Sequence, residues 1–75
     1  SLTRSEFQLL RLLAARPGEA FARAQIMEEL WQTEFDGDER ACDVHISNLR
    51  QKIETDAQRP ELIQTVRGIG YKFAE

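Results

Sequence analysis

Four side chains between positions 40 and 48 could together recognise the edge of a nucleic-acid base. On a helix, at about 100° per residue, they fall on one side, opposite an apolar stripe. They are Arg40, Val44, Ser47 and Asn48. A valine gains nothing by facing water, whereas in the major groove of DNA it can contact a thymine methyl group beside hydrogen-bonding neighbours. Isolated exposed apolar residues are common, so this pattern alone also fits a solvated helix surface.

A second candidate group lies near the C-terminus, where Arg67-Gly68-Ile69-Gly70 separates two segments rich in β-forming residues. This pattern predicts a hairpin with Arg67 in its turn. The two glycines do not indicate a nucleotide cradle, because a third glycine and a following helix are missing. A cation in such a turn is usually solvated, so its role depends on what lies beside it.

Other chemistries are not supported by the spacing of the residues. Cys42 and His45 are three residues apart, but no second pair completes a four-ligand zinc site. Asp36 and Asp38 resemble the start of a calcium loop, yet Arg40 stands at the fifth ligand position. No serine is arranged with a histidine and an acid as in a catalytic triad. We therefore expect no enzyme activity, no metal and no cofactor.

Length and composition indicate a single globular domain over residues 1–75, with 41% hydrophobic and 31% charged residues. No apolar run approaches the roughly 18 residues of a membrane span. The single cysteine precludes an internal disulfide and fits a reducing, cytoplasmic location. The formal net charge of −3 argues against a protein that binds polyanions without regard to their sequence or structure.

The charge is distributed unevenly along the chain. Residues 28–39 contain six acidic and no basic residues, whereas the rest of the chain contains ten basic and seven acidic residues. If the basic segments near residues 40–52 and 59–72 share a face, a basic surface exists on an acidic protein.

The first of three predicted helices has a clear start. Thr3 and Glu6 have the spacing of a capping box, and Leu2 and Phe7 occupy the flanking staple positions. We expect the helix to end near Arg16, before a Pro-Gly break. Its predicted apolar face consists of Phe7, Leu9, Leu10, Leu13 and Ala14.

Two more helices follow a very short strand at Phe21. The second helix has a poor N-cap in Ala22, and its apolar stripe consists of Ile26, Met27, Leu30 and Trp31. The third is expected from about Glu39 to Thr55, with Asp38 near its N-cap. Its buried stripe consists of Cys42, Ile46, Leu49 and Ile53.

The chain is predicted to close with strands at Leu62–Val66 and Tyr71–Phe73. Three helices followed by a β-hairpin define an α+β fold of the winged helix-turn-helix type. In that fold the third helix enters the major groove of DNA, and the hairpin, or wing, reaches the backbone or the minor groove.

Four motifs in this order resemble the DNA-binding effector domain of the OmpR/PhoB response regulators, and the resemblance covers essentially the whole chain. The motifs are Leu2-Thr3-Arg4-Ser5-Glu6-Phe7-Gln8-Leu9-Leu10, Ala14-Ala15-Arg16-Pro17-Gly18, Asp43-Val44-His45-Ile46-Ser47-Asn48-Leu49-Arg50-Gln51-Lys52-Ile53 and Thr65-Val66-Arg67-Gly68-Ile69-Gly70-Tyr71. The resemblance implies a transcription factor with an N-terminal receiver domain that a sensor kinase phosphorylates on Asp. It also implies tandem binding of two domains to direct-repeat sites on double-stranded DNA.

The resemblance assigns roles to individual residues. The base-reading positions correspond to Arg40, Val44, Ser47 and Asn48. The positions that contact the DNA backbone correspond to Arg23, Trp31, His45, Arg50 and Thr65. Arg67 corresponds to the cation that enters a narrow minor groove, where the negative potential is enhanced. The acidic segment from Gln32 to Glu39, with Glu34, Asp36 and Asp38, corresponds to a loop that can contact RNA polymerase.

This sequence also departs from the family. Members usually begin with a four-stranded antiparallel sheet, which nothing before Ser1 supplies. Asn48 stands where many relatives place Arg, which is expected to shift base preference, and asparagine can pair bidentately with adenine. Two alternatives stay open: a winged helix used for protein contacts, and the effector domain of a kinase-independent or membrane-tethered regulator.

Overall fold

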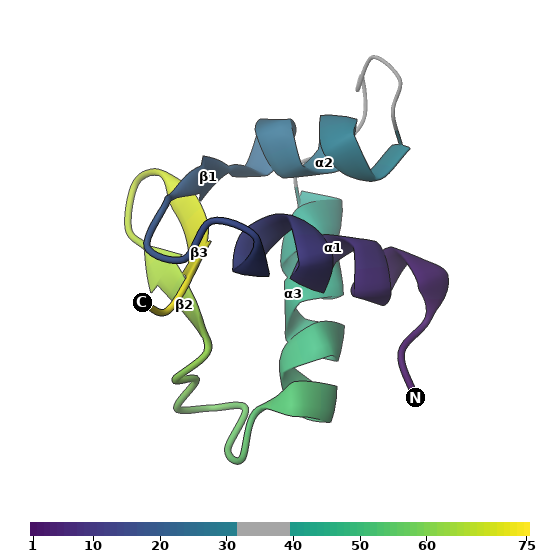
Figure 1. The fold of residues 1–75 in the computed structure, drawn as a ribbon, viewed down its shortest axis with the longest axis vertical. Helices are drawn as coiled ribbons and strands as arrows, with labels where there is room; N and C mark the ends of the chain where they lie inside the picture. The colour runs from purple at the N-terminus through teal and green to yellow at the C-terminus, as the bar shows by residue number, and fades with distance from the viewer. Residues whose placement is uncertain (32–39) are drawn as a thin grey trace.

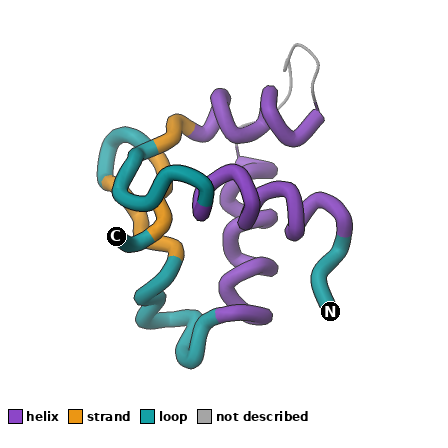
Figure 2. Tube along the Cα trace, in the orientation of Figure 1, coloured by secondary structure: helices purple, strands orange, loops and turns teal. Residues whose placement is uncertain are grey.

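The computed structural model describes residues 1–31 and 40–75. In chain order the elements are α1 (Arg4–Ala14), β1 (Phe21–Ala22), α2 (Arg23–Trp31), α3 (Arg40–Ile53), β2 (Ile63–Val66) and β3 (Gly70–Phe73). Figure 1 shows α1 crossing α3, with α2 lying crosswise at the N-terminal end of α3 and the small sheet beside the helices. The colouring by secondary structure in Figure 2 shows the strands gathered at one side of the molecule. The predicted α+β winged helix is confirmed.

The start of α1 follows the predicted capping box. The Glu6 backbone N–H donates to Thr3 Oγ1 over 3.1 Å, and the Thr3 N–H donates to Glu6 Oε1 over 2.9 Å. The helix ends at Ala14 rather than near Arg16, because the Arg16 N–H bonds to Leu13 O in a tighter turn.

The core contains most of the predicted apolar stripes. The buried apolar residues are Leu9, Leu13, Phe21, Ile26, Met27, Cys42, Ile46, Leu49, Ile63 and Tyr71. Ile53 and Leu10 are partly buried and pack against this cluster. The prediction that Phe7 lies on the buried face of α1 is wrong: Phe7 is 54% exposed, because α2 and α3 pack against the side of α1 that carries Leu9 and Leu13.

The strands form one antiparallel sheet in the order β1-β3-β2. In the predicted hairpin, Ile63 pairs with Phe73 and Thr65 with Tyr71. The turn closes by a 2.9 Å bond from the Ile69 N–H to Val66 O. Gly68, with a φ of 82°, takes the left-handed conformation that such a turn requires at its third residue.

The short β1 extends the hairpin to three strands, a pairing that the sequence pattern does not indicate. Phe21 pairs with Tyr71, and Ala22 pairs with Gly70. Gly70 is buried, and a Cβ at this position would collide with the Phe21 carbonyl oxygen. The absence of a side chain therefore lets β1 approach the wing.

Ala22 also provides the entry into α2. Its backbone N–H donates to Gln25 Oε1 over 3.4 Å, which is one half of a capping box; the other half is missing because alanine has no side-chain acceptor for the Gln25 N–H. Among the described helices, none combines the length and apolar character that a bilayer crossing requires.

Candidate nucleic-acid interface

Helix α3 has three faces, each with its own surroundings. The first packs into the core through Cys42, Ile46 and Leu49. The second carries side chains that bond to the wing or to the segment before it; these are Asp43 and Arg50 on the helix and Glu54 directly after its last residue. These positions are 7 and 4 residues apart in the sequence, so they fall within about 40° of one another around the axis. The third face is open.

The open face contains all four predicted base-reading residues. Arg40, Ser47 and Asn48 are exposed, and Val44 is 58% exposed. His45, one of the residues expected at the DNA backbone, is half-buried. A 14-residue helix with one uncovered side has the length and shape to lie in a major groove.

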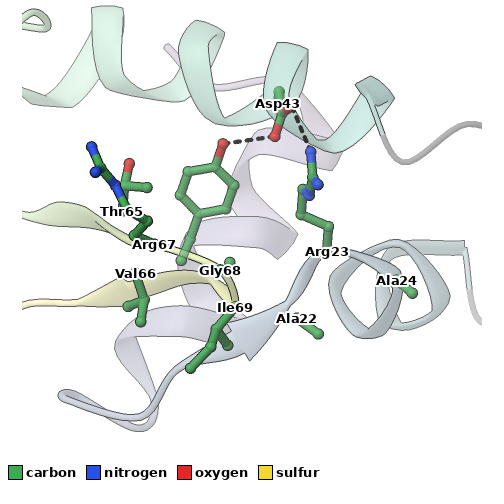
Figure 3. Close-up of a pocket in the computed structure, with 11 residues that line it drawn as sticks. Ala22, Arg23, Ala24, Asp43, Thr65, Val66, Arg67, Gly68 and Ile69 are labelled. Carbon is green, nitrogen blue, oxygen red and sulfur yellow. Dashed lines mark hydrogen bonds and ion pairs between the residues drawn. The ribbon is translucent and has the colours of Figure 1, made fainter.

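The wing presents two different sides. In Figure 3, Thr65 and Arg67 lie on the side of the hairpin towards α3, while Val66 and Ile69 lie on the other side. Thr65 and Arg67 are both exposed. The alternation of side chains along β2 places Thr65 and Val66 on opposite sides, and the turn that follows carries Arg67 and Ile69. The exposed face of α3 is thus accompanied by a cation on the near side of the wing.

Asp43 forms a junction between three elements. Tyr71 Oη, on β3, donates to Asp43 Oδ1 over 2.7 Å, and Arg23 Nη1, at the start of α2, lies 3.0 Å from Asp43 Oδ2. Figure 3 draws both interactions at the hollow of about 420 Å³ between the start of α2, Asp43 and the wing. Burial, together with the hydrogen bond to Asp43, raises the pKa of Tyr71 to about 12. Tyr71 therefore remains a hydrogen-bond donor at neutral pH.

Arg50 attaches β2 to α3. Its Nε and Nη2 donate to Ile63 O over 3.0 and 2.7 Å, and Nη2 also donates to Thr65 Oγ1 over 3.1 Å. The guanidinium carbon lies 5.4 Å from the centroid of the Tyr71 ring, within cation–π distance. The phosphate contacts expected of Arg50 and Thr65 remain predictions, and the structure adds that both side chains hold the wing in place.

Glu54, immediately after α3, attaches the segment that leads into β2. Its two carboxylate oxygens accept backbone N–H groups of Glu61, Leu62 and Ile63 over distances from 2.8 to 3.1 Å. Burial alone would raise the pKa of Glu54, but the N–H donors of Ile63, Glu61 and Leu62, aided by the charge of Arg50, lower the pKa below its ordinary value. The carboxylate is therefore charged at neutral pH.

Two of the sequence predictions lie outside the described part of the chain. The acidic loop, with Glu34, Asp36 and Asp38, falls within residues 32–39, as does the predicted N-cap at Asp38. Trp31 is the last residue of α2, and its side chain is not described. Within the described ranges, no cluster of three or more His, Cys, Asp or Glu side chains could hold a metal ion.

The sequence interpretation did not assign a role to Asp43, Glu54 or Tyr71. A signal existed for two of them: Asp43, Arg50 and Glu54 follow one line between the apolar stripe and the open face. Charged groups at the border of a buried stripe indicate contacts to a neighbouring element. Tyr71 had no such signal, because only the tertiary structure shows that its hydroxyl lies beside Asp43.

The open face of α3, the attached wing and the three-helix core together define a winged helix-turn-helix domain. The chain belongs to the family described as "Transcriptional regulatory protein, C terminal", whose model matches residues 1–73.

Relatives and solved structures agree with this assignment. The chain is 53% identical over 74 residues to the probable transcriptional regulator ycf27 of Guillardia theta, covering 96% of this chain and 29% of that protein. It is 50% identical over 72 residues to the heme response regulator HssR of Staphylococcus aureus, covering 96% of this chain and 32% of that protein. The chain therefore spans about a third of the length of these curated relatives.

Among solved structures, the DNA-binding domain of RstA from Klebsiella pneumoniae, in complex with the RstA box, superimposes with a TM-score of 0.86 at 38% identity. The match covers 99% of this chain and 73% of that domain.

Proposed function

We propose that this domain binds double-stranded DNA in a sequence-specific manner and acts as the output domain of a transcriptional response regulator. One observation carries the proposal: the exposed face of α3 stands beside a wing whose Arg67 lies on the α3 side. A helix in the major groove and a cation at the adjacent minor groove need this juxtaposition. The RstA domain, solved in complex with its DNA box, supports the proposal through its close structural similarity.

In this proposal the residues have distinct roles. The reading of bases falls to Arg40, Val44, Ser47 and Asn48, and Arg67 occupies the minor groove. Contacts to the DNA backbone come from Arg23, Trp31, His45, Arg50 and Thr65. Phosphate contacts supply most of the affinity, whereas base contacts supply the preference for one sequence.

The wider proposal concerns the parent protein. A receiver domain phosphorylated by a sensor kinase would control this output domain in the cytoplasm, and two copies would bind direct repeats in tandem. Pairing on adjacent half-sites raises the apparent affinity of domains that bind weakly alone. The acidic segment 32–39 would contact RNA polymerase, because its negative charge suits a basic surface on a partner.

The test begins with selection of bound duplexes from a random DNA pool by the 75-residue chain. Binding of the selected duplex is then measured by fluorescence anisotropy over a range of salt concentrations. With about four to six phosphates neutralised, log K should fall with log salt at a slope near −4 to −5. Failure to enrich any sequence, together with a flat salt response, would contradict the proposal.

A second function is suggested by the charge of the chain. With a net charge of −3, a winged helix can serve protein contacts instead of DNA. The same salt titration separates the two functions, because a protein interface of this size lacks the steep dependence that counterion release produces. Neither experiment tests for enzyme activity, whose absence stays an expectation from the residue pattern.

A further inference from the structure

We propose that Asp43 is a positioning residue that fixes the wing relative to α3. It would thereby set the distance along the DNA between the bases that α3 reads and the minor-groove site that Arg67 contacts. The inference rests on the proposed DNA binding and assigns a determinant of sequence preference within it. The inference is based on the junction at Asp43, where one carboxylate accepts hydrogen bonds from Tyr71 of the wing and Arg23 of α2.

The place of Asp43 on α3 is the first part of the argument. It precedes Val44 directly and lies about one helical turn from both Arg40 and Ser47. A bare carboxylate here would repel the phosphates on either side of a groove. Its two oxygens are instead occupied by the Tyr71 hydroxyl and the Arg23 guanidinium, so the charge is paired within the domain.

The place of Tyr71 on the wing is the second part. Tyr71 pairs in register with Thr65, and Arg67 follows Thr65 by two residues at the start of the turn. A shift of the Tyr71 hydroxyl therefore moves the strand that carries the wing cation. The bond from Tyr71 to Asp43 is a direct side-chain link between this end of the hairpin and the N-terminal half of α3, where Arg40 and Val44 lie.

The other attachments hold the strand β2 and the segment before it, not β3. Glu54 bonds to the segment at Glu61–Ile63, and Arg50 bonds to Ile63 O and Thr65 Oγ1. Arg50, near the C-terminal end of α3, holds β2 as far as Thr65, and Glu54, directly after α3, holds the segment before β2. If the Tyr71 bond is removed, β2 stays attached to Arg50, but β3 loses its hydrogen bond to Asp43 and the hairpin can tilt about β2. Arg67 would then meet the minor groove at a less defined distance from the bases that α3 reads.

The experiment compares two duplexes, one selected from a random pool by the wild-type chain and one of the same composition with a scrambled sequence. Their dissociation constants are measured at fixed salt for the wild type, Tyr71→Phe and Asp43→Asn. Tyr71→Phe removes one oxygen and changes no charge. Its affinity for the selected duplex should fall about five-fold, while its affinity for the scrambled duplex stays unchanged.

Asp43→Asn separates the effect of charge from the effect of wing position. Removal of a negative charge should raise the affinity for the scrambled duplex, whereas loss of the positioned wing should lower the ratio of the two affinities. The ratio of the double variant should be no smaller than that of the worse single variant, because both changes act on the Tyr71–Asp43 bond. Glu61→Gln, at an exposed glutamate in the loop before β2, makes the same charge change and should leave the ratio unaltered.

The outcomes are separable. An unchanged ratio in Tyr71→Phe overturns the inference, even if Asp43→Asn does not fold. A proportional loss for both duplexes, accompanied by a lower melting temperature, assigns Asp43 and Tyr71 to stability alone and also overturns it. If the wild type itself selects no sequence, the proposed function fails before this comparison begins, so the two failures are distinguishable.

Discussion

Lys52 Nζ lies 2.7 Å from Glu6 Oε1, and this ion pair joins the last turn of α3 to the first turn of α1. The Glu6 side chain is only 7% exposed, whereas that of Lys52 is 38% exposed. The same Glu6 oxygen accepts the Thr3 N–H. One carboxylate therefore caps α1 and ties it to the helix that carries the base-reading residues.

The first prediction concerns pH. The hydrogen bond from Lys52, followed by that from Thr3, lowers the pKa of Glu6 below its ordinary value of 4.5, against the opposing effect of burial. A lowered pKa in the folded state means that the stabilisation is complete above pH 4.5 and is lost as the pH falls through the folded-state pKa. Glu6→Gln should therefore melt below the wild type at neutral pH, and the difference should shrink on acidification. Thermal unfolding followed by circular dichroism at several pH values measures it.

Glu19→Gln is the matched control for this experiment. Glu19 lies 3.6 Å from Arg16, but both side chains are well exposed, and such surface pairs contribute little. Its melting curve should follow the wild type at every pH. A constant difference between Glu6→Gln and the wild type across the acid range would contradict the assignment.

The second prediction concerns the Glu54 carboxylate. A glutamine has a single carbonyl oxygen, so Glu54→Gln cannot satisfy the three backbone N–H groups that Glu54 accepts. The loss should lower the free energy of unfolding by about 1 to 2 kcal/mol, measured by urea denaturation. Hydrogen exchange at Leu62 and Ile63 should accelerate more than exchange in α1. Equal stability of Glu61→Gln and the wild type would exclude a general charge effect as the cause.

The third prediction compares two glycines of the wing. Gly70→Ala places a methyl group against the Phe21 carbonyl oxygen and should cost about 2 kcal/mol or more, because β1 must separate from β3. At Gly68 the added methyl meets no atom within 4 Å, so only the φ of 82° opposes the change, at about 1 kcal/mol. Urea denaturation of both variants should rank Gly70→Ala as the less stable. The reverse order would show that β1 pairing contributes little.

Much of the helical part of this fold could be predicted from the sequence because its signals are local. Thr3 and Glu6 are three residues apart, and the stripe of Cys42, Ile46 and Leu49 follows the helical period. The exposure of Phe7 could not be predicted in this way. Its position on the helix is compatible with burial, and only the arrangement of α2 and α3 around α1 decides which edge of the apolar face is covered.

The candidate site divides in the same manner. The open face of α3 follows from periodicity, since it is the side opposite the core stripe. The junction of Asp43 with Tyr71 joins residues 28 positions apart, and that of Arg50 with Ile63 spans 13 positions. No local pattern encodes such distances. They depend on how the wing closes against α3, which long-range packing determines.

The last prediction tests the two sides of the proposed groove contact. Val44→Asp places a charge on the open face of α3, and Arg67→Ala removes the cation on the wing. Each should weaken binding of the selected duplex about ten-fold or more, measured by anisotropy, because one repels phosphates and the other loses a groove contact. Arg67→Ala should also reduce the salt slope by about 1. Both residues are exposed, so the melting temperature should change little.

Arg59→Ala is the control for that comparison, because it removes the same charge from an exposed position in the turn between α3 and β2. If nonspecific attraction to DNA accounted for the binding, Arg59→Ala and Arg67→Ala would weaken it alike and neither would alter sequence preference. If the wing cation acts in the minor groove, only Arg67→Ala changes the ratio of selected to scrambled duplex binding. Unaltered binding in both Val44→Asp and Arg67→Ala would contradict the groove assignment, because that assignment places the DNA grooves against the α3 face and the wing.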